Sequence, residues 1–223
     1  MNKRATVAVT IARQLGSGGS FIAQQLARRL NYKYMDREIL REAARQLGQS
    51  EEALLGQEER ISPLWEKILR AFSPGIPEAP YVAPPLPLGL DKDLFQAEAK
   101  IIRDVSDLYD AVIVGRGAVH ILKGRPGLIP VFIHAGKEFR VGRIMDLYGV
   151  SDPRQARSMI ERSDTQRAEF IQTMAGAAWT DARNYHVCVD TSVVGFPTAE
   201  AWLAQLVNET ELRLAAGEEH RGE

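Results

Sequence analysis

The sequence predicts an α/β domain in which a parallel sheet of about five strands lies between two layers of helices. Two observations predict this class. Short apolar runs rich in β-branched residues alternate with segments of helical periodicity. In addition, the first apolar run is followed by a glycine-rich stretch and then a helix pattern, the order that opens a βαβ unit. We therefore expect one domain with a single core over residues 1–223.

The expected strands are short and apolar throughout, which suits strands that are buried on both faces of a sheet. They cover residues 5–12, 32–35, 111–114, 129–134 and 186–190. Cys188 falls inside the last run and is expected to be an inert core residue. Asp190 and Thr191 end that run, and they either line a ligand site or cap a turn, of which we favour the turn. Trp179 and Tyr185 are expected to pack before it.

Helices are expected where apolar residues recur every three or four positions. The first carries Ile22, Leu26 and Leu30 on one face, and the last carries Trp202, Leu203, Leu206 and Val207. The others are expected over residues 38–71, 91–109 and 137–174. Residues 73–90 hold six of the eleven prolines, which cannot donate backbone hydrogen bonds. This segment is expected to be a surface excursion, with a PxxP-type ligand as the alternative.

Charge and composition exclude several classes of protein. The 28 Lys and Arg residues nearly balance the 29 Asp and Glu residues, giving a net charge of −1. This balance removes the electrostatic basis for a general nucleic-acid binder or a polybasic membrane anchor. One cysteine cannot form an intramolecular disulfide, and no apolar run approaches the roughly 20 residues of a membrane span. We therefore expect a cytoplasmic protein with neither nucleic-acid nor membrane partners.

The stretch Gly16-Ser17-Gly18-Gly19-Ser20 is a candidate anion site, because small residues at a helix N-terminus let backbone N–H groups face one anion. The dinucleotide fingerprint G-x-G-x-x-G fails at Phe21, although Asp36 lies about where a ribose-binding acid is expected. The mononucleotide pattern G-x-x-x-x-G-K-[ST] fits the spacing better. It places Arg13 at its first glycine and Gly19 at its lysine. A glycine-rich turn without a ligand is the alternative.

If this loop binds phosphates, the charge of the missing lysine must come from elsewhere, and arginines are the obvious substitutes. Ser20 takes the hydroxyl position of the pattern and would hold Mg²⁺. One Lys and six Arg lie between residues 137 and 167. Arg154 and Arg157 are expected on a solvated helix surface, whereas Arg140 and Arg143 fit either a solvated surface or a site.

Several stretches of the chain resemble the cytidylate-kinase-like proteins, relatives of bacterial cytidylate kinases whose phosphate loop reads GSGG. They are ARQLGSGGSFIAQQLARRLNYKYMDREIL (12–40), AVIVGRGA (111–118), ERSDTQRAEF (161–170) and WTDARNYHVCVDTS (179–192). Their order and spacing make the match specific. The resemblance implies a three-layer P-loop kinase fold with an Arg-rich helical lid at about 137–174. It also implies ATP and Mg²⁺ as cofactors and nucleotides as substrates.

The resemblance also implies roles for individual residues. It assigns binding of the ATP phosphates to residues 16–20, which are Gly16, Ser17, Gly18, Gly19 and Ser20. Arg13, at the first position of the mononucleotide pattern, is a further candidate for this role. It assigns acceptor binding to Asp36, Arg37 and Asp164. Phosphoryl-transfer roles fall to Arg116, Arg162 and Arg167. We expect Arg116→Ala to lower phosphotransfer strongly and to leave the fold intact.

The function implied is the transfer of the γ-phosphoryl group of ATP to CMP or dCMP. Two departures from the pattern of cytidylate kinases keep two other functions open. Gly19 in place of the loop lysine favours a nucleotide-binding regulatory or sensor protein with weak or no catalysis. Residues 48–92 diverge from the base-recognition segment of cytidylate kinases, which favours a kinase for another small acceptor.

Overall fold

A parallel sheet with the strand order β2-β3-β1-β4-β5 forms the centre of the molecule. The computed structural model describes residues 5–40, 43 and 92–217. The strands are β1 (Ala8–Arg13), β2 (Lys33–Met35), β3 (Ala111–Val114), β4 (Leu128–His134) and β5 (Val187–Asp190). Each expected apolar run thus contains a strand, and the predicted fold class is confirmed.

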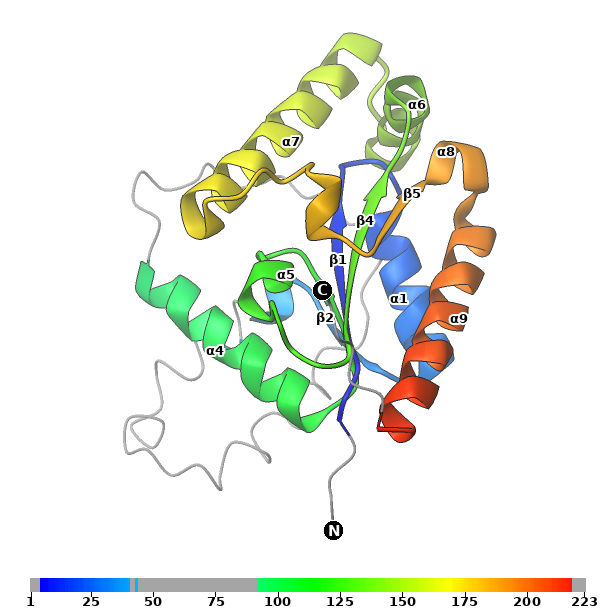
Figure 1. Cartoon of the computed structure of the whole chain (residues 1–223). Helices are drawn as coiled ribbons and strands as arrows, with labels where there is room; N and C mark the ends of the chain where they lie inside the picture. The colour runs from blue at the N-terminus through cyan, green and yellow to red at the C-terminus, as the bar shows by residue number, and fades with distance from the viewer. Residues whose placement is uncertain (1–4, 41–42, 44–91, 218–223) are drawn as a thin grey trace.

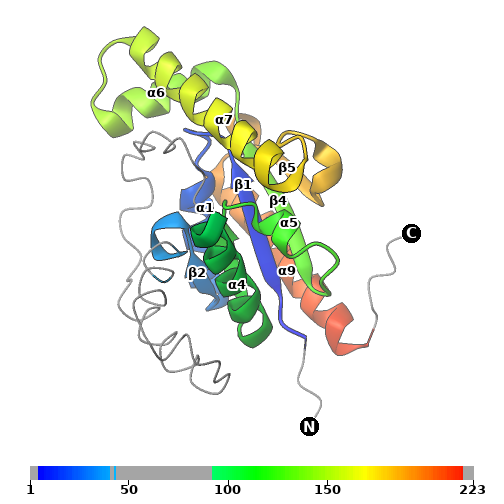
Figure 2. The same ribbon diagram turned by 90° about the vertical axis from the view of Figure 1, so that its left-hand side faces the viewer.

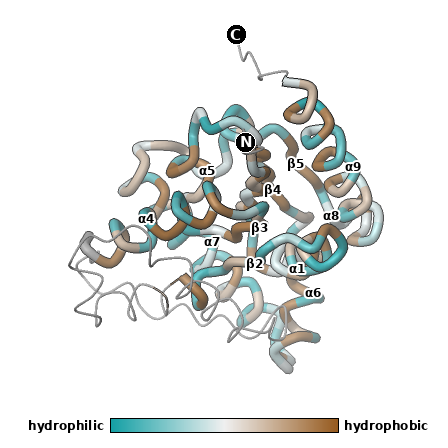
Figure 3. Tube along the Cα trace, turned by 90° about the horizontal axis from the view of Figure 1, so that it is seen from below, coloured by the Kyte–Doolittle hydropathy of each residue, from teal (hydrophilic) through white to brown (hydrophobic). Residues whose placement is uncertain are grey.

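The sheet lies between two layers of helices (Figure 1). Helices α1 (Gly19–Leu30) and α9 (Phe196–Ala215) cover one face, and α4 (Lys92–Leu108) and α5 (Ala118–Ile121) cover the other. Alternate residues of a strand point to opposite faces. Val9 accordingly packs in the core beside α1 and α9, whereas Ala8 packs in the core beside α4. Figure 3 shows the apolar strands between these layers.

All strand pairs are parallel, so the carboxyl ends of the strands meet at one edge of the sheet. Above this edge, α6 (Lys137–Tyr148) and α7 (Pro153–Ala175) form a helical hairpin (Figures 1 and 2). The two helices pack together around Val141, Ile144 and Ile160, and Leu15 joins this cluster from the segment after β1. The hairpin is therefore packed against the glycine-rich loop, and it occupies the predicted helical region.

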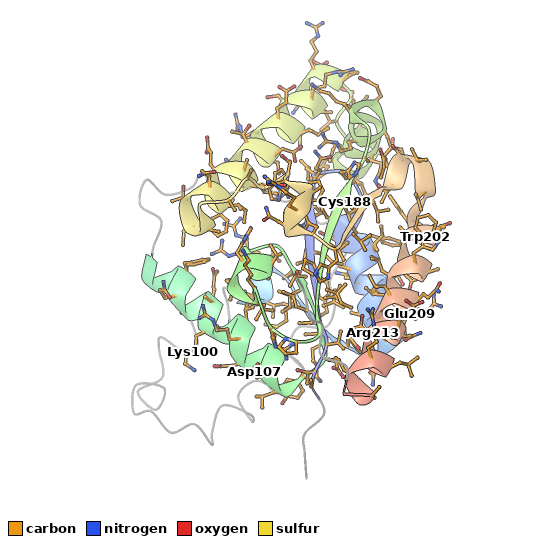
Figure 4. All side chains as sticks on the ribbon, viewed as in Figure 1. Lys100, Asp107, Cys188, Trp202, Glu209 and Arg213 are labelled. Carbon is orange, nitrogen blue, oxygen red and sulfur yellow. The ribbon has the colours of Figure 1, made fainter. Side chains whose placement is uncertain are left out.

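The segment around β5 confirms one expectation and corrects another. After the short η3 helix (Ala182–Asn184), the Tyr185 hydroxyl donates to the carbonyl oxygen of Trp179 at 2.7 Å, and both rings pack against Phe132 as expected. Cys188, labelled in Figure 4, is exposed, so the prediction of a core cysteine is wrong. The reason is that β5 is an edge strand, and the helices leave the side of it that bears Cys188 uncovered.

Some predictions fall on residues outside the described ranges. These are the proline-rich segment 73–90 and all but the beginning of the helix expected over 38–71. Within the ranges that are described, no helix combines the length and the apolar character needed to cross a bilayer.

Candidate active site

The glycine-rich loop joins the end of β1 to the start of α1. Gly16 and Gly18 both have φ of +79°, a left-handed conformation that residues with a Cβ adopt at a cost. Gly18 is the N-cap of α1, and no side chain caps that helix end. An anion placed there would meet backbone N–H groups and the positive end of the helix dipole. The loop therefore has the geometry of the predicted phosphate site.

Hydrogen bonds from three directions fix the loop. The Ser17 hydroxyl donates to the carbonyl oxygen of Gln14 at 2.8 Å, and the Thr191 hydroxyl donates to the carbonyl oxygen of Ser17 at 2.7 Å. The Leu15 N–H donates to the Asp164 carboxylate at 3.2 Å. Thr191 is buried at the end of β5, so it supports the loop, while Asp190 caps the short α8 helix (Thr191–Val194) as the favoured reading predicts.

The side chain of Arg13 runs along this loop toward the neighbouring strand β3. Its Nε donates to the Ser20 hydroxyl at 3.3 Å. Its Nη1 lies against Gly115, in the space that a Cβ on that glycine would fill. Burial lowers the pKa of Arg13, and the nearby Tyr34 and Asp36 partly offset this effect. A desolvated guanidinium therefore crosses the carboxyl edge of the sheet between the loop and β3.

The helical hairpin adds two arginines and a carboxylate beside the loop. Arg140 is buried, and its Nη1 donates to Asp164 at 2.6 Å and to the Leu15 carbonyl oxygen at 3.3 Å. Arg167 also donates to Asp164, at 3.5 Å. Burial and, next, repulsion by Arg13 lower the pKa of Arg167 to about 9. Arg13 and Arg167 are thus close enough to repel each other, which favours an anion between or beside them.

Three other arginines of the α6–α7 hairpin, Arg154, Arg157 and Arg162, lie outside this cluster. Arg162 is exposed on α7, and no hydrogen bond or ion pair of the described residues joins it to the loop. Arg154 is also exposed, and Arg157 pairs with Glu138 at 2.7 Å on the surface, as expected for solvated helices. Of the predicted lid residues, the structure therefore brings Asp164 and Arg167 to the loop but not Arg162.

On the β2 side of Arg13, Asp36 follows directly after the strand. Its Oδ1 accepts hydrogen bonds from the N–H groups of Glu38 at 3.0 Å and Ile39 at 3.1 Å, so it caps the helical turn that begins there. Burial and then Asp36 raise the pKa of Tyr34, which keeps its phenol protonated. Arg37 is half-buried in the same turn. This group occupies the place that the family resemblance assigns to acceptor binding.

Arg116 follows the end of β3 and is held from both sides. It has a positive φ of +54°, which is uncommon outside glycine. Its guanidinium forms an ion pair with Glu98 of α4 and lies 4.7 Å from the ring centroid of Phe170 of α7. Glu98 is almost fully buried, and its Oε1 has no hydrogen-bond partner among the described residues. The sequence did not single out Glu98, because a glutamate in an amphipathic helix is ordinarily solvated.

The loop and its arginines fit the phosphates of a nucleotide, since backbone donors and desolvated cations converge there. A protein-only metal cage is not found: within the described ranges, no three His, Cys, Asp or Glu residues are grouped to hold an ion. Mg²⁺ in nucleotide sites is usually held by one or two protein oxygens together with phosphates and water. The Ser20 hydroxyl at the start of α1 fits that smaller role.

Comparison with known proteins places this arrangement in a family. A solved structure of an uncharacterized protein from Eubacterium ventriosum is 23% identical, with a TM-score of 0.68, and the match covers 91% of this chain and 99% of that one. A shikimate kinase from Bacteroides thetaiotaomicron shares the fold at 11% identity and a TM-score of 0.50, with 91% and 98% of the two chains covered. None of the curated proteins matches. The model of the cytidylate kinase-like family matches residues 8–193, which include the loop, the α6–α7 hairpin and every strand, so the chain belongs to the cytidylate kinase-like family.

Proposed function

We propose that this protein is an ATP- and Mg²⁺-dependent kinase that transfers the γ-phosphoryl group of ATP to a nucleoside monophosphate, CMP or dCMP. The observation that carries the proposal is that Arg13 and, through Asp164, Arg167 lie beside a glycine loop at the start of a helix. Membership of the cytidylate kinase-like family supports a kinase. The cytidine base is proposed from the resemblance.

Phosphoryl transfer needs positioning and positive charge more than covalent chemistry, because negative charge spreads over the oxygens of the transferred group. The loop N–H groups and Arg13 would bind the phosphates of the donor. Arg167, carried by α7, would contact the transferred group from the other side. The Ser20 hydroxyl would hold Mg²⁺, which would supply positive charge to the donor phosphates.

The acceptor would bind on the β2 and β3 side of Arg13. Arg116 presents a planar guanidinium, the group best suited to hold a monophosphate through paired hydrogen bonds. Glu98 and Phe170 fix its orientation. Asp36 and Arg37 would contact the rest of the acceptor, and Asp164 would act on it only through Arg140 and Arg167. We also propose a cytoplasmic location, where both nucleotides are available.

The second candidate is a nucleotide-binding regulatory or sensor protein of the same fold. It is favoured by Gly19 at the lysine position of the loop, since that lysine ordinarily reaches the β- and γ-phosphates. Both candidates bind Mg-ATP, and only the kinase turns it over. A kinase for another small acceptor differs from the first proposal in the acceptor alone.

One experiment separates these functions. Purified protein is incubated with Mg-ATP and a panel of nucleoside monophosphates and small alcohols, and ADP formation is measured beside thermal-shift titrations of each compound. CMP- or dCMP-dependent turnover is the expected result. Stabilisation by Mg-ATP without turnover would support the sensor, and turnover only with a non-nucleotide acceptor would support the third candidate. When arginines of the site are replaced in this assay, Arg154→Ala, which removes an exposed arginine of α7, is the matched control.

A further inference from the structure

Gly19 stands where the mononucleotide pattern has its lysine, yet its backbone does not require a glycine. Gly16 and Gly18 have positive φ, whereas Gly19 does not. What excludes a side chain at Gly19 is Arg13. A Cβ built on Gly19 would lie 2.5 Å from the Arg13 Cβ, 3.0 Å from its Cγ and 3.3 Å from the Cβ of Ile133. The Cβ of Arg13 is fixed by the backbone of β1 and cannot swing aside.

Arg13 itself stands at the position of the pattern's first glycine. Its side chain therefore starts at the end of β1, passes over Gly19, reaches the Ser20 hydroxyl with Nε and ends against Gly115. This course places the aliphatic part of Arg13 beside the residue that would carry the lysine, and its guanidinium at Ser20 and Gly115. The pattern's glycine and its cation are thus both present, with their two positions exchanged.

The positive charge of Arg13 is also available to an anionic ligand. Across the described part of the chain, no carboxylate forms an ion pair with Arg13, and its hydrogen bond goes to the neutral hydroxyl of Ser20. The nearby Asp36 offsets the effect of burial only in part. Arg116 and Arg140, by contrast, are each paired directly with a carboxylate, Glu98 and Asp164. A desolvated cation without a direct counter-ion is costly, and an anionic ligand removes that cost.

We infer that Arg13 and Gly19 are a reciprocal exchange within the phosphate loop. Arg13 supplies to the donor phosphates the cation that a lysine at position 19 supplies in the usual pattern, and Gly19 leaves the room that Arg13 needs. The inference rests on the proposed binding of ATP at this loop. It implies that the two positions act as a unit, so that each substitution alone is harmful and the two together restore the site.

The test compares the parent with Arg13→Gln, Arg13→Gly, Gly19→Lys and the double variant Arg13→Gly/Gly19→Lys. Affinities for Mg-ATP and for inorganic triphosphate are measured by calorimetry, and the midpoint of thermal unfolding is measured for each protein. Arg13→Gln keeps the Cβ and Cγ that lie beside Gly19 and replaces the charged guanidinium by a neutral amide, so it reports on binding even if the glycine variant folds poorly. Arg154→Ala is the control for the loss of one exposed positive charge.

We expect both Arg13 variants to bind inorganic triphosphate at least tenfold more weakly than the parent and the double variant to return to within about threefold of it. Gly19→Lys alone is expected to lower the unfolding midpoint, because its side chain meets Arg13. Parental affinity in Arg13→Gln would overturn the inference. So would a folded double variant that binds no more tightly than Arg13→Gly.

A second comparison tests the packing without any ligand. Gly19→Ala is expected to destabilise the parent and to have little effect in the Arg13→Gly background, and an equal loss in both would contradict the steric half of the inference. The same measurements distinguish a failure of the proposed function from a failure of this inference. A parent that binds inorganic triphosphate but not Mg-ATP would contradict an ATP-dependent kinase while Arg13→Gln still decides the role of Arg13. A parent that binds neither would overturn both.

Discussion

Arginine residues in this protein differ in what balances their charge, and this decides what each can do. Arg157 is balanced by Glu138 at the surface, where such pairs contribute little to stability. Arg116 is balanced by the buried carboxylate of Glu98. Arg13 has no direct counter-ion among the described residues. Arg157 is therefore a surface group, Arg116 is held in one orientation, and Arg13 is available to bind an anion.

The Arg116–Glu98 pair changes the expectation that Arg116→Ala leaves the fold intact. Removing Arg116 alone leaves a buried carboxylate without its partner, which costs about 3 kcal/mol or more in comparable pairs. We therefore expect Arg116→Ala to lower both phosphotransfer and the free energy of unfolding. In Arg116→Ala/Glu98→Gln, stability should largely return while activity stays low. Urea unfolding and ADP formation measure the two effects, and a double variant that regains activity would remove Arg116 from the acceptor site.

At the scale of elements, the glycine loop depends on contacts from α6, α7 and β5. Asp164 is the junction, because it accepts from the Leu15 N–H and from both Arg140 and Arg167. Thr191 holds the opposite side of the loop at the Ser17 carbonyl oxygen. The α6–α7 hairpin is thus joined to the loop by the Asp164 carboxylate, by the Arg140 hydrogen bond to the Leu15 carbonyl oxygen and by the packing of Leu15.

Replacing that carboxylate should loosen the lid. We expect Asp164→Ala to lower the free energy of unfolding by about 2 kcal/mol or more, because two arginines lose their counter-ion and an N–H loses its acceptor. Hydrogen exchange should rise in the loop and in α7 but not in β1 or β3. Arg157→Ala, which breaks only the exposed pair with Glu138, is the control and should cost about 0.5 kcal/mol or less. Equal exchange in both variants would contradict this role of Asp164.

At the scale of the whole molecule, a net charge of −1 conceals a positive site at one edge of the sheet. Burial disfavours the charge of Arg167 there, and repulsion by Arg13 adds to the cost. A base whose pKa is lowered by folding is harder to charge in the folded chain than in the unfolded one. At neutral pH, where Arg167 is protonated in both states, its charge therefore reduces the stability of the ligand-free protein.

We accordingly expect Arg167→Gln to raise the unfolding midpoint of the ligand-free protein by about 2–4 °C for each kcal/mol of relieved repulsion. The same variant should lose most of the stabilisation that Mg-ATP gives to the parent. Differential scanning fluorimetry with and without Mg-ATP measures both quantities. An Arg167→Gln protein that is less stable than the parent, or that keeps the full response to Mg-ATP, would show that Arg167 has a structural role instead.

The fold could be predicted from the sequence because short apolar runs and helical periodicity are local patterns. The loop could also be located, since its small residues follow a strand, and Asp36 and Arg116 were found in stretches that resemble the family. Other features depend on packing between distant segments. No local pattern indicates that Glu98 is buried beside Arg116, that Thr191 supports Ser17, or that Arg162 is exposed while Arg167 faces the loop. Cys188 was misjudged because an apolar run does not show which strand lies at an edge.

The contact between Arg13 and the Cβ position of Gly19 also bears on how such a loop can diverge. A chain of the usual pattern that gained an arginine at position 13 would clash with its own lysine, and one that lost the lysine first would have no cation. Evolution from one arrangement to the other therefore either goes through an intermediate with a clash or without the cation, or requires both substitutions together. Among related sequences, we expect a large side chain at one of these two positions to be accompanied by a glycine at the other.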